Sequence, residues 1–544
     1  LNKFRVIANI SINDLSVSKK KLIFKAETLK IPCMATISSH VLKDKIDAEG
    51  TCIIQGGQFS KEGQKRMAID IPIHFSMNYP NTITVSSHAV KGNLFFDNHP
   101  YPVDELISDL QMNLNLDQPN NIEIDASIQT KFSDPISLSG TFDMRKKTLS
   151  DSTIKIDDID CRILPKSLNH LIPEFYKEWV AQGCISLDAT LIQEDGKKSD
   201  GTSISTNISL TDLGFNSPDY DYFGENINGI IKADLIIDKL FNRLSFRTNC
   251  IVEPFLIQLG FFTTDMKNRQ TRFSFSGDYA PWNKNLSNLR GALSWEDIGA
   301  ITVDGELFSL ADKPLMDIHV SMKELSHTSL FETFVKDTIQ YSHPSLFQSR
   351  IEGEFNGKFH VLGSHNSIDV DGNINIKESN VTLKDFTLEG LTVDLPISIS
   401  YPLSTRIIRK QDVPDSQYGT VRVKKITQGP LEIADLQLRP IIIANNFFIK
   451  DLLKIPLFGG ALEIKDVSVE NITTPDRKIK LAFQLQDINL EEITATYNLT
   501  PIAGTLNSSP LPFEQKRDRL YSQGEMKIDV FGGDIIISNL GFNN

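Results

Sequence analysis

The sequence predicts a mainly β protein built as an elongated, curved antiparallel sheet with a few short amphipathic helices. Apolar and polar residues alternate over runs of four to eight positions, most clearly between residues 355 and 399. Such alternation indicates strands with one apolar and one polar face. The turns between runs are short and polar, as at residues 363–366, which favours antiparallel neighbours.

Length and charge narrow the classes of protein that fit. The chain has 544 residues, whereas a single hydrophobic core stops growing at about 250–300 residues. We therefore expect several domains or one repeat-like structure. The formal net charge is −13, which argues against a nucleic-acid binder because such proteins need a basic surface. It also argues against docking of the whole surface on anionic lipid headgroups.

Changes in hydrophobic period divide the chain into five parts. Residues 1–164, 183–324 and 348–544 keep the period of two and are predicted as segments of sheet. Residues 165–182 and 325–347 carry apolar residues at spacings of three and four, which is typical of amphipathic helices.

Short local signals place the helix ends and turns. Ser329 and Glu332 predict a capping box in the 325–347 helix. A third, short helix is expected over residues 489–496 with Asn489 as its N-cap. Within the long alternating stretch, residues 378–380 and 389–390 are interpreted as turns.

The last part of the chain contains a repeat. The segment LFGGALEIKDV starting at Leu457 matches VFGGDIIISNL starting at Val530, an offset of 530 − 457 = 73 residues. The glycine pair in each copy is predicted to let the backbone bend or bulge where the sheet turns a corner.

Residues that could take part in catalysis or bind a metal do not occur at recognisable spacings. The five cysteines are scattered without a CxxC pair, and the ten histidines form no HExxH motif. His360 and His365 flank a turn, but we do not assign them a metal. No G-x-S-x-G motif and no phosphate loop occur. We therefore expect no enzymatic activity, no catalytic residues, no cofactor and no metal site.

The order of motifs near the C-terminus resembles a known family. LFGGALEIKDVSVEN is followed by DINLEEI, PIAGTL, SPLPF and GEMKIDVFGGDIIISNLG. This order is similar to the C-terminal part of the AsmA-like superfamily of Gram-negative envelope proteins, which includes the TamB-like and YdbH-like members. Residues 171–188 also resemble a linker and strand restart of such proteins. The motifs lie within residues 457–541, and the rest of the chain matches in architecture only.

The resemblance implies a repeating β-groove, with residues 1–164, 183–324 and 348–544 as β-groove segments. It implies a periplasmic protein of the cell envelope that carries phospholipid between the inner and outer membranes. An outer-membrane partner protein and an inner-membrane anchor are further implications. The family's membrane helix is not in this sequence, and the chain begins at Leu1 and ends inside a motif. We therefore expect the anchor to lie outside this fragment.

An open antiparallel sheet has to cover its apolar face, and few helical segments are available for this purpose. The sheet would therefore have to curl on itself or bind a ligand, and the ligand that the resemblance implies is a lipid. The predicted lining of the groove consists of residues on the apolar parity of their strands. They are Phe355, Phe359, Val361, Ile374, Ile376, Val381, Leu383, Leu391, Val393, Leu462, Ile464, Ile535 and Ile537.

Other interpretations of the same stripes remain open. The apolar residues could form an ordinary sandwich core. The chain could be an assembly factor for outer-membrane β-barrel proteins that templates strands on an exposed sheet edge. It could also be a surface adhesin or polysaccharide-acting protein with a β-helix, although the regular coils of about 20–25 residues expected for that fold are missing. Copurified lipid would distinguish the first hypothesis from these.

Overall fold

The structure is a computed structural model divided into two compact units, Leu1–Gly260 and Phe261–Asn544. It describes residues 2–543 except for 20–21, 41–42, 62–63, 80–81, 89–90, 97–98, 103–106, 119–120, 131–132, 146–147, 163–177, 195–200, 239–240, 261, 267, 311–312, 340–346, 403–409, 474–476, 517–518, 523–524, 531–532 and 539–540.

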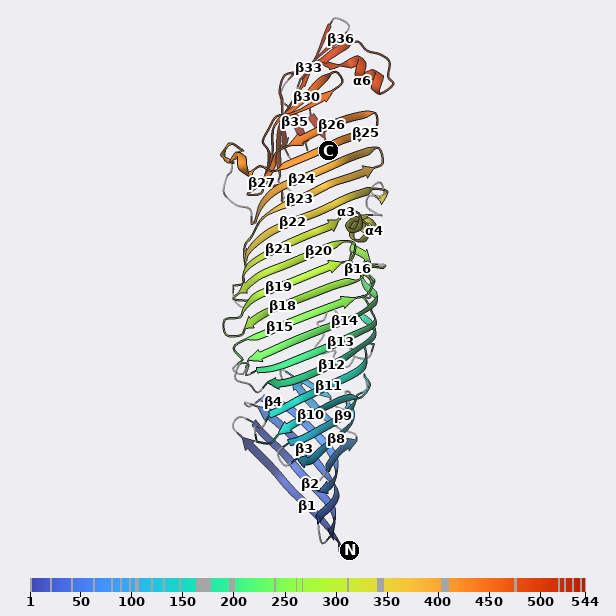
Figure 1. Ribbon diagram of the computed structural model, residues 1–544, viewed down its shortest axis with the longest axis vertical. Coiled ribbons are helices and arrows are strands. Elements are labelled where there is room, and N and C mark those ends of the chain that lie inside the picture. Colours follow the sequence, from blue (N-terminus) through green and yellow to red (C-terminus); the bar gives the residue numbers. More distant parts are fainter. Residues whose placement is uncertain are drawn as a thin grey trace. The chain divides into compact units, whose positions relative to one another are not determined.

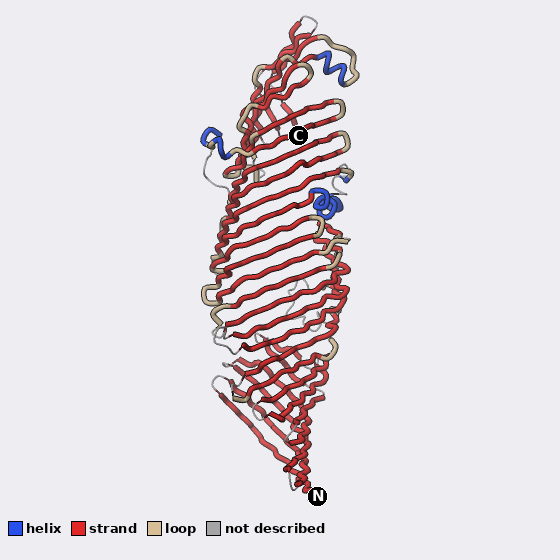
Figure 2. Tube along the Cα trace, viewed as in Figure 1, coloured by secondary structure: helices blue, strands red, loops and turns tan. Residues whose placement is uncertain are grey.

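Both units are mainly β and mostly antiparallel, which confirms the predicted fold class at this level (Figures 1 and 2). A single parallel bridge among the described pairings joins Ile397 to Ile442. In each unit the described part of the sheet stays open, because no pairing returns from its last strand to its first. The curvature and elongation of the expected groove remain predictions.

In the first unit, most strands pair with the next strand along the chain, as expected for short connections. β4 pairs with both β5 and β6, and β5 continues the ladder to β8. The strands are β1 (Asn2–Lys19), β2 (Leu22–His40), β3 (Lys43–Lys61), β4 (Gln64–Tyr79), β5 (Thr82–His88), β6 (Lys91–Phe96), β7 (His99–Pro102), β8 (Ile107–Gln118), β9 (Asn121–Thr130), β10 (Ile136–Asp143), β11 (Thr148–Asp160), β12 (Val180–Glu194), β13 (Gly201–Asn216), β14 (Tyr222–Asp238), β15 (Leu244–Val252) and β16 (Leu256–Leu259).

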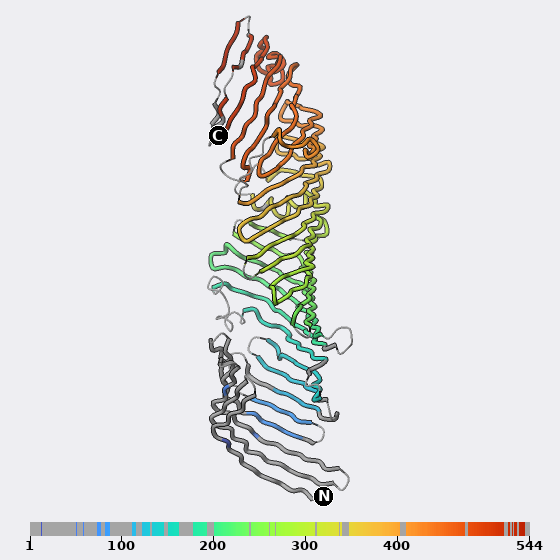
Figure 3. The backbone as a smooth tube through the Cα atoms, turned by 90° about the vertical axis from the view of Figure 1, so that its left-hand side faces the viewer, coloured from blue at the N-terminus to red at the C-terminus, as the bar shows by residue number. Residues whose placement is uncertain are grey.

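In the second unit, β18 to β26 form a continuous antiparallel ladder in chain order (Figure 3). The strands are β17 (Phe262–Asp265), β18 (Thr271–Ala280), β19 (Asn285–Trp295), β20 (Gly299–Phe308), β21 (Leu315–Ser326), β22 (Arg350–Ser364), β23 (Ile368–Leu383), β24 (Phe386–Tyr401), β25 (Thr420–Gln428), β26 (Leu431–Leu438), β27 (Pro440–Ile443), β28 (Asn446–Ile449), β29 (Leu453–Leu457), β30 (Gly460–Glu470), β31 (Lys478–Gln486), β32 (Ile488–Asn489), β33 (Gly504–Ser508), β34 (Leu511–Lys516), β35 (Arg519–Ser522), β36 (Glu525–Val530), β37 (Gly533–Ser538) and β38 (Gly541–Asn543). A separate four-stranded sheet contains β32, β33, β36 and β37.

The helical segment after β21 lies within the predicted range 325–347 and begins at His327. It consists of α3 (His327–Leu330), the π-helix η2 (Phe331–Val335) and α4 (Lys336–Ile339). The predicted capping box at Ser329 is wrong. The N-cap is Ser326, whose side chain accepts a hydrogen bond from the Ser329 backbone N–H at 3.3 Å. Ser326 has the extended backbone that this role requires, whereas Ser329 already lies in the first turn.

The other helical predictions have mixed outcomes. The short helix α6 (Leu490–Thr496) is confirmed, and its N-cap Asn489 accepts a hydrogen bond from the Glu491 backbone N–H at 2.8 Å. Most of the predicted 165–182 insert lies outside the described residues, and 180–182 already belong to β12. Two short 3-10 helices, η3 (Lys410–Asp412) and η4 (Asp415–Gln417), have no counterpart in the sequence predictions.

Two predicted turns are β-bulges. β23 runs through residues 378–380 and β24 runs through 389–390, so each predicted pair of short strands is one strand of 16 residues. Glu378 has a φ of 48° and Gly390 a φ of 64°, and the register shifts beside them. Turns and bulges call for the same residue types, because both need positive φ. Such residues form a bulge where strand pairing continues on both sides of them, and a turn where it does not.

The repeated glycine pair is a hairpin turn rather than a bend within a strand. Leu457 pairs with Gly460, and the two residues between them, Phe458 and Gly459, have φ values of 47° and 71°. Two successive positive φ angles are typical of the two-residue turns that suit the twist of a hairpin. In the second copy Val530 pairs with Gly533 in the same register. The intervening residues 531–532 lie outside the described residues.

Burial of the His327 side chain gives a first prediction. Its Nδ1 lies 2.9 Å from Ser379 Oγ, and burial lowers the pKa of this imidazole, partly opposed by a backbone hydrogen bond at Glu352. Because the folded state favours the neutral ring, its contribution to stability is present above the unfolded pKa of about 6.5 and is lost as pH falls through the folded pKa. We expect the melting temperature of the wild type to fall more steeply on acidification than that of His327→Asn. Parallel curves for the two proteins would contradict this.

Candidate functional site: an apolar face in the second unit

Cross-strand register in the second unit aligns apolar side chains into rows across β18 to β24. Residues that are directly opposite in an antiparallel pair share a face of the sheet. One row contains Phe275, Gly291, Val303, Val320, Phe359, Gly372 and Ile397. The next contains Phe273, Leu293, Ile301, Met322, Gly357, Ile374 and Leu395. A third, starting at β19, contains Leu289, Gly305, Ile318, Val361, Val370 and Ile399. We call the surface formed by these three rows the apolar face.

The opposite face of the same strands is polar. One row across it contains Ser276, Arg290, Asp304, His319, His360, Asp371 and Ser398. Apolar and polar rows therefore alternate along each strand, as a pleated strand requires. The sheet has one face suited to an apolar ligand and one suited to water.

Nine of the thirteen predicted lining residues lie on the apolar face or its continuation along β22 to β24. Phe355 pairs with Ile376, and Ile376 pairs with Val393. Val381 pairs with Leu388 beyond the two bulges. The bulge at Glu378 adds one residue to β23. The apolar positions of this strand are therefore even-numbered before the bulge and odd-numbered after it, although all of them lie on the same face.

The other four predicted residues lie in different ladders. Leu462 and Ile464 are on β30, where they pair with Leu485 and Phe483 of β31. Ile535 and Ile537 are on β37 in the four-stranded sheet, and Ile535 is 53% exposed. Among the described pairings, β24 connects to β30 only through β27 and β28, and β37 belongs to the separate four-stranded sheet, so a single face shared by all thirteen remains a prediction.

Most of the apolar face is only partly buried. Phe359, Val361 and Ile374 are half-buried, and Phe273 is 42% exposed. An ordinary sandwich core would bury these side chains under a second layer. The sheet in the described residues instead leaves them accessible, which disfavours the sandwich interpretation for this part of the chain.

The helical segment after β21 covers one margin of the apolar face. The Phe334 ring lies 5.7 Å from Trp295 and 6.4 Å from Phe262, measured between centroids. Thr264 Oγ1 donates a hydrogen bond to the Thr333 carbonyl at 3.1 Å, and both residues are buried. This amphipathic segment therefore packs its apolar side against the strand ends and leaves the middle of the face uncovered.

The first unit has an apolar face of its own. Its register aligns Ile156, Leu187, Ile208, Ile231 and Cys250 across β11 to β15. Along β14, residues 230–236 alternate between exposed and half-buried side chains. The sheet of the first unit thus follows the same design, although none of its residues is among the predicted lining.

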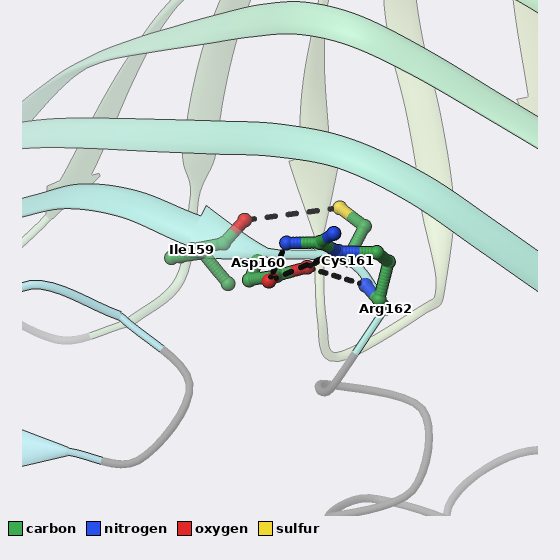
Figure 4. Close-up of polar contacts among 4 residues, drawn as sticks. All are labelled: Ile159, Asp160, Cys161 and Arg162. Carbon is green, nitrogen blue, oxygen red and sulfur yellow. Dashed lines mark hydrogen bonds and ion pairs between the residues drawn. The ribbon is translucent and has the colours of Figure 1, made fainter.

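The most buried of the described cysteines has the properties of a packed side chain rather than of a reactive thiol. Cys161 is 8% exposed at the end of β11, with Sγ 3.9 Å from the Ile159 carbonyl (Figure 4). Burial raises the pKa of its thiol, which favours the unreactive neutral form. Next to it, Arg162 Nη2 donates to Asp160 Oδ2 at 2.7 Å, and this hydrogen bond lowers the pKa of the Asp160 carboxyl.

Comparison with known proteins gives no assignment. No protein-family model matches the chain, and no curated protein sequence matches it. Within the residues that the structure describes, no helix is long and apolar enough to cross a membrane. The apolar face is therefore the main evidence on function.

Sequence reasoning missed the part of the apolar face that lies on β18 to β21. Phe273 and Phe275 belong to the two rows that cross seven strands, and Val303 and Val320 share the row of the predicted Phe359. Their alternation is visible in the sequence between 271 and 322. What the sequence does not reveal is the register that connects this stretch with residues 355–399.

Glycines under the aromatic rings give a second prediction. A Cβ at Gly372 would clash with the Lys358 carbonyl oxygen and lie 2.6 Å from Phe359 Cδ1, whereas a Cβ at Gly291 has its nearest neighbour at 3.5 Å. Both glycines are in the same apolar row. We expect Gly372→Ala to lower stability by about 1–3 kcal/mol through overpacking, measured as a lower midpoint in urea. Gly291→Ala, the matched control, should leave the midpoint unchanged or raise it. Equal midpoints for the two variants would disprove the close packing of Phe359.

Proposed function

We propose that this protein binds phospholipid on the apolar face and conducts it between the inner and outer membranes of a cell envelope. The observation that carries the proposal is the continuity of the rows, two of which cross seven adjacent strands from β18 to β24 with only apolar residues and glycine. Acyl chains lying on such a face would remove apolar surface of both ligand and protein from water.

The energetics of lipid transfer favour a continuous surface over isolated sites. A two-chain lipid has roughly 30 methylenes, and each costs about 0.8 kcal/mol to expose to water. Passage through water would therefore cost over about 20 kcal/mol on this scale. A face that stays apolar from one strand to the next lowers this barrier without any chemical step, which agrees with the expectation that the protein is not an enzyme.

The side-chain types also favour lipid over a protein partner. Binding hot spots in protein interfaces are enriched in Trp, Tyr and Arg. The three rows contain Phe, Ile, Leu, Val, Met and Gly but none of those three types. Aliphatic and phenyl side chains without polar anchors suit acyl chains, which bring no hydrogen-bonding groups of their own.

The sequence resemblance to the AsmA-like superfamily supports the wider setting. On this proposal the sheet forms an elongated, curved, repeating β-groove in the periplasm. An inner-membrane anchor and an outer-membrane partner protein would complete the bridge. In the alternative role, a sheet edge templates strands of outer-membrane β-barrel proteins. This role does not require lipid on the apolar face, so the experiment below distinguishes it from lipid transfer.

A charge placed on the apolar face should block lipid binding. In Ile376→Asp the carboxylate would lie between Phe355 and Val393, where desolvation in contact with acyl chains is costly. We expect at least about a tenfold loss of affinity, equal to about 1.4 kcal/mol, for a fluorescently labelled phosphatidylethanolamine. Mass spectrometry of the gently purified wild type should also detect bound phospholipid.

The control for this experiment lies on the same strand. Thr382 is exposed and pairs with Arg350, so Thr382→Asp adds the same charge on the polar parity beside a cation. This variant should bind the labelled lipid like the wild type, and the melting temperatures of both variants show whether they are folded. If folded Ile376→Asp and Thr382→Asp bind equally well, the apolar face is not the lipid site. Absence of lipid binding by the wild type would favour the strand-templating alternative.

A further inference from the structure

Two histidines that are 41 residues apart in the sequence lie side by side on the polar face. His319 of β21 and His360 of β22 are directly opposite in the ladder. Their rings are stacked with centroids 4.4 Å apart and an interplanar angle of 8°. Asp317 is two residues before His319 on the same strand, so the carboxylate points to the same face as the imidazole.

The three side chains bring their donor atoms together. His360 Nε2 lies 2.8 Å from Asp317 Oδ1. One ligand atom from each of Asp317, His319 and His360 lies within 4.8 Å of the other two. A zinc ion bonds nitrogen and oxygen ligands at about 2.0–2.2 Å, so small rotations of partly exposed side chains bring all three into its coordination sphere. The side chains of His360 and Asp317 are 37% and 50% exposed, and that of His319 is 59% exposed.

We propose that Asp317, His319 and His360 bind a divalent transition-metal ion, with Zn²⁺ as the best match. Two imidazoles and a carboxylate are the ligand types preferred by this group of metals, whereas Ca²⁺ and Mg²⁺ prefer oxygen ligands. Three protein ligands leave at least one coordination position for water, because the site faces solvent. The net charge of −13 further favours cation binding on this protein.

Two more carboxylates stand next to the histidines in the same polar row. Asp304 of β20 is directly opposite His319, with its Oδ2 3.9 Å from His319 Nδ1, and Asp371 of β23 is directly opposite His360. Carboxylates beside ligating histidines orient the rings and raise their basicity. A metal bound here would link β21 to β22 on the polar face. The proposal does not depend on lipid binding, which uses the other face.

The test is a calorimetric titration of the purified protein with ZnCl₂, followed by a titration with Co²⁺ monitored by visible absorption. We expect the wild type to bind one more equivalent of Zn²⁺ than the His319→Gln/His360→Gln double variant. This site should have a Kd tighter than about 100 µM, and Asp317→Asn should raise the Kd at least about tenfold. His365→Gln is the matched control, since His365 is an exposed histidine in the turn after β22. It should leave binding unchanged.

Zn²⁺ should also raise the melting temperature of the wild type more than that of the double variant, because a ligand that binds only the folded state stabilises it. Strong visible absorption of the Co²⁺ form indicates a site of low coordination number, as three protein ligands predict. The proposal is overturned if the double variant keeps the stoichiometry and affinity of the wild type. A Kd weaker than about 100 µM would indicate an adventitious ion only and also overturns the proposal.

Discussion

The antiparallel register of β18 to β24 is the constraint on which the rest of this structure depends. Because the side-chain period of a strand is two, a slip of one residue would move every apolar side chain of a strand to the wet face. Phe359 and His360 are adjacent in β22, but their side chains point to opposite faces. The common register places the cross-strand neighbours of each on the same face as that residue. The two faces of one sheet thus acquire different chemistry without a second layer. The bulges at Glu378 and Gly390 preserve this separation, because the residue that each adds keeps Ile376, Val381 and Val393 on one face.

Much of the fold was predictable from the sequence, because period-two alternation and turn residues are local signals. They predicted a mainly β, antiparallel protein, the helical segment after β21 and the N-cap at Asn489. Local signals failed at Glu378 and Gly390, where a turn and a bulge call for the same residue types. They also failed for Ser326, because its extended backbone conformation is decided by the end of β21.

The candidate sites were predictable only in part, because they depend on pairing between distant residues. The parity of Phe355 to Val393 can be read along one stretch, and the register places these residues on one face. The extension to Phe273 and Val303, and the meeting of His319 with His360, depend on strand order and register. A sequence shows which residues alternate, but the ladder determines which of them become neighbours.

A photocrosslinking scan along β22 shows most directly whether phospholipid lies on the apolar face. A benzophenone side chain would replace Phe359, Val361, Lys358 or Leu362 in turn, with phospholipid present. Leu362 is the sharpest control, since it is apolar but lies on the polar parity and is 42% exposed. If phospholipid lies on the apolar face, lipid crosslinks form at 359 and 361 and none form at 358 and 362. Crosslinks of equal yield at all four positions, or at Leu362 rather than Val361, would contradict this.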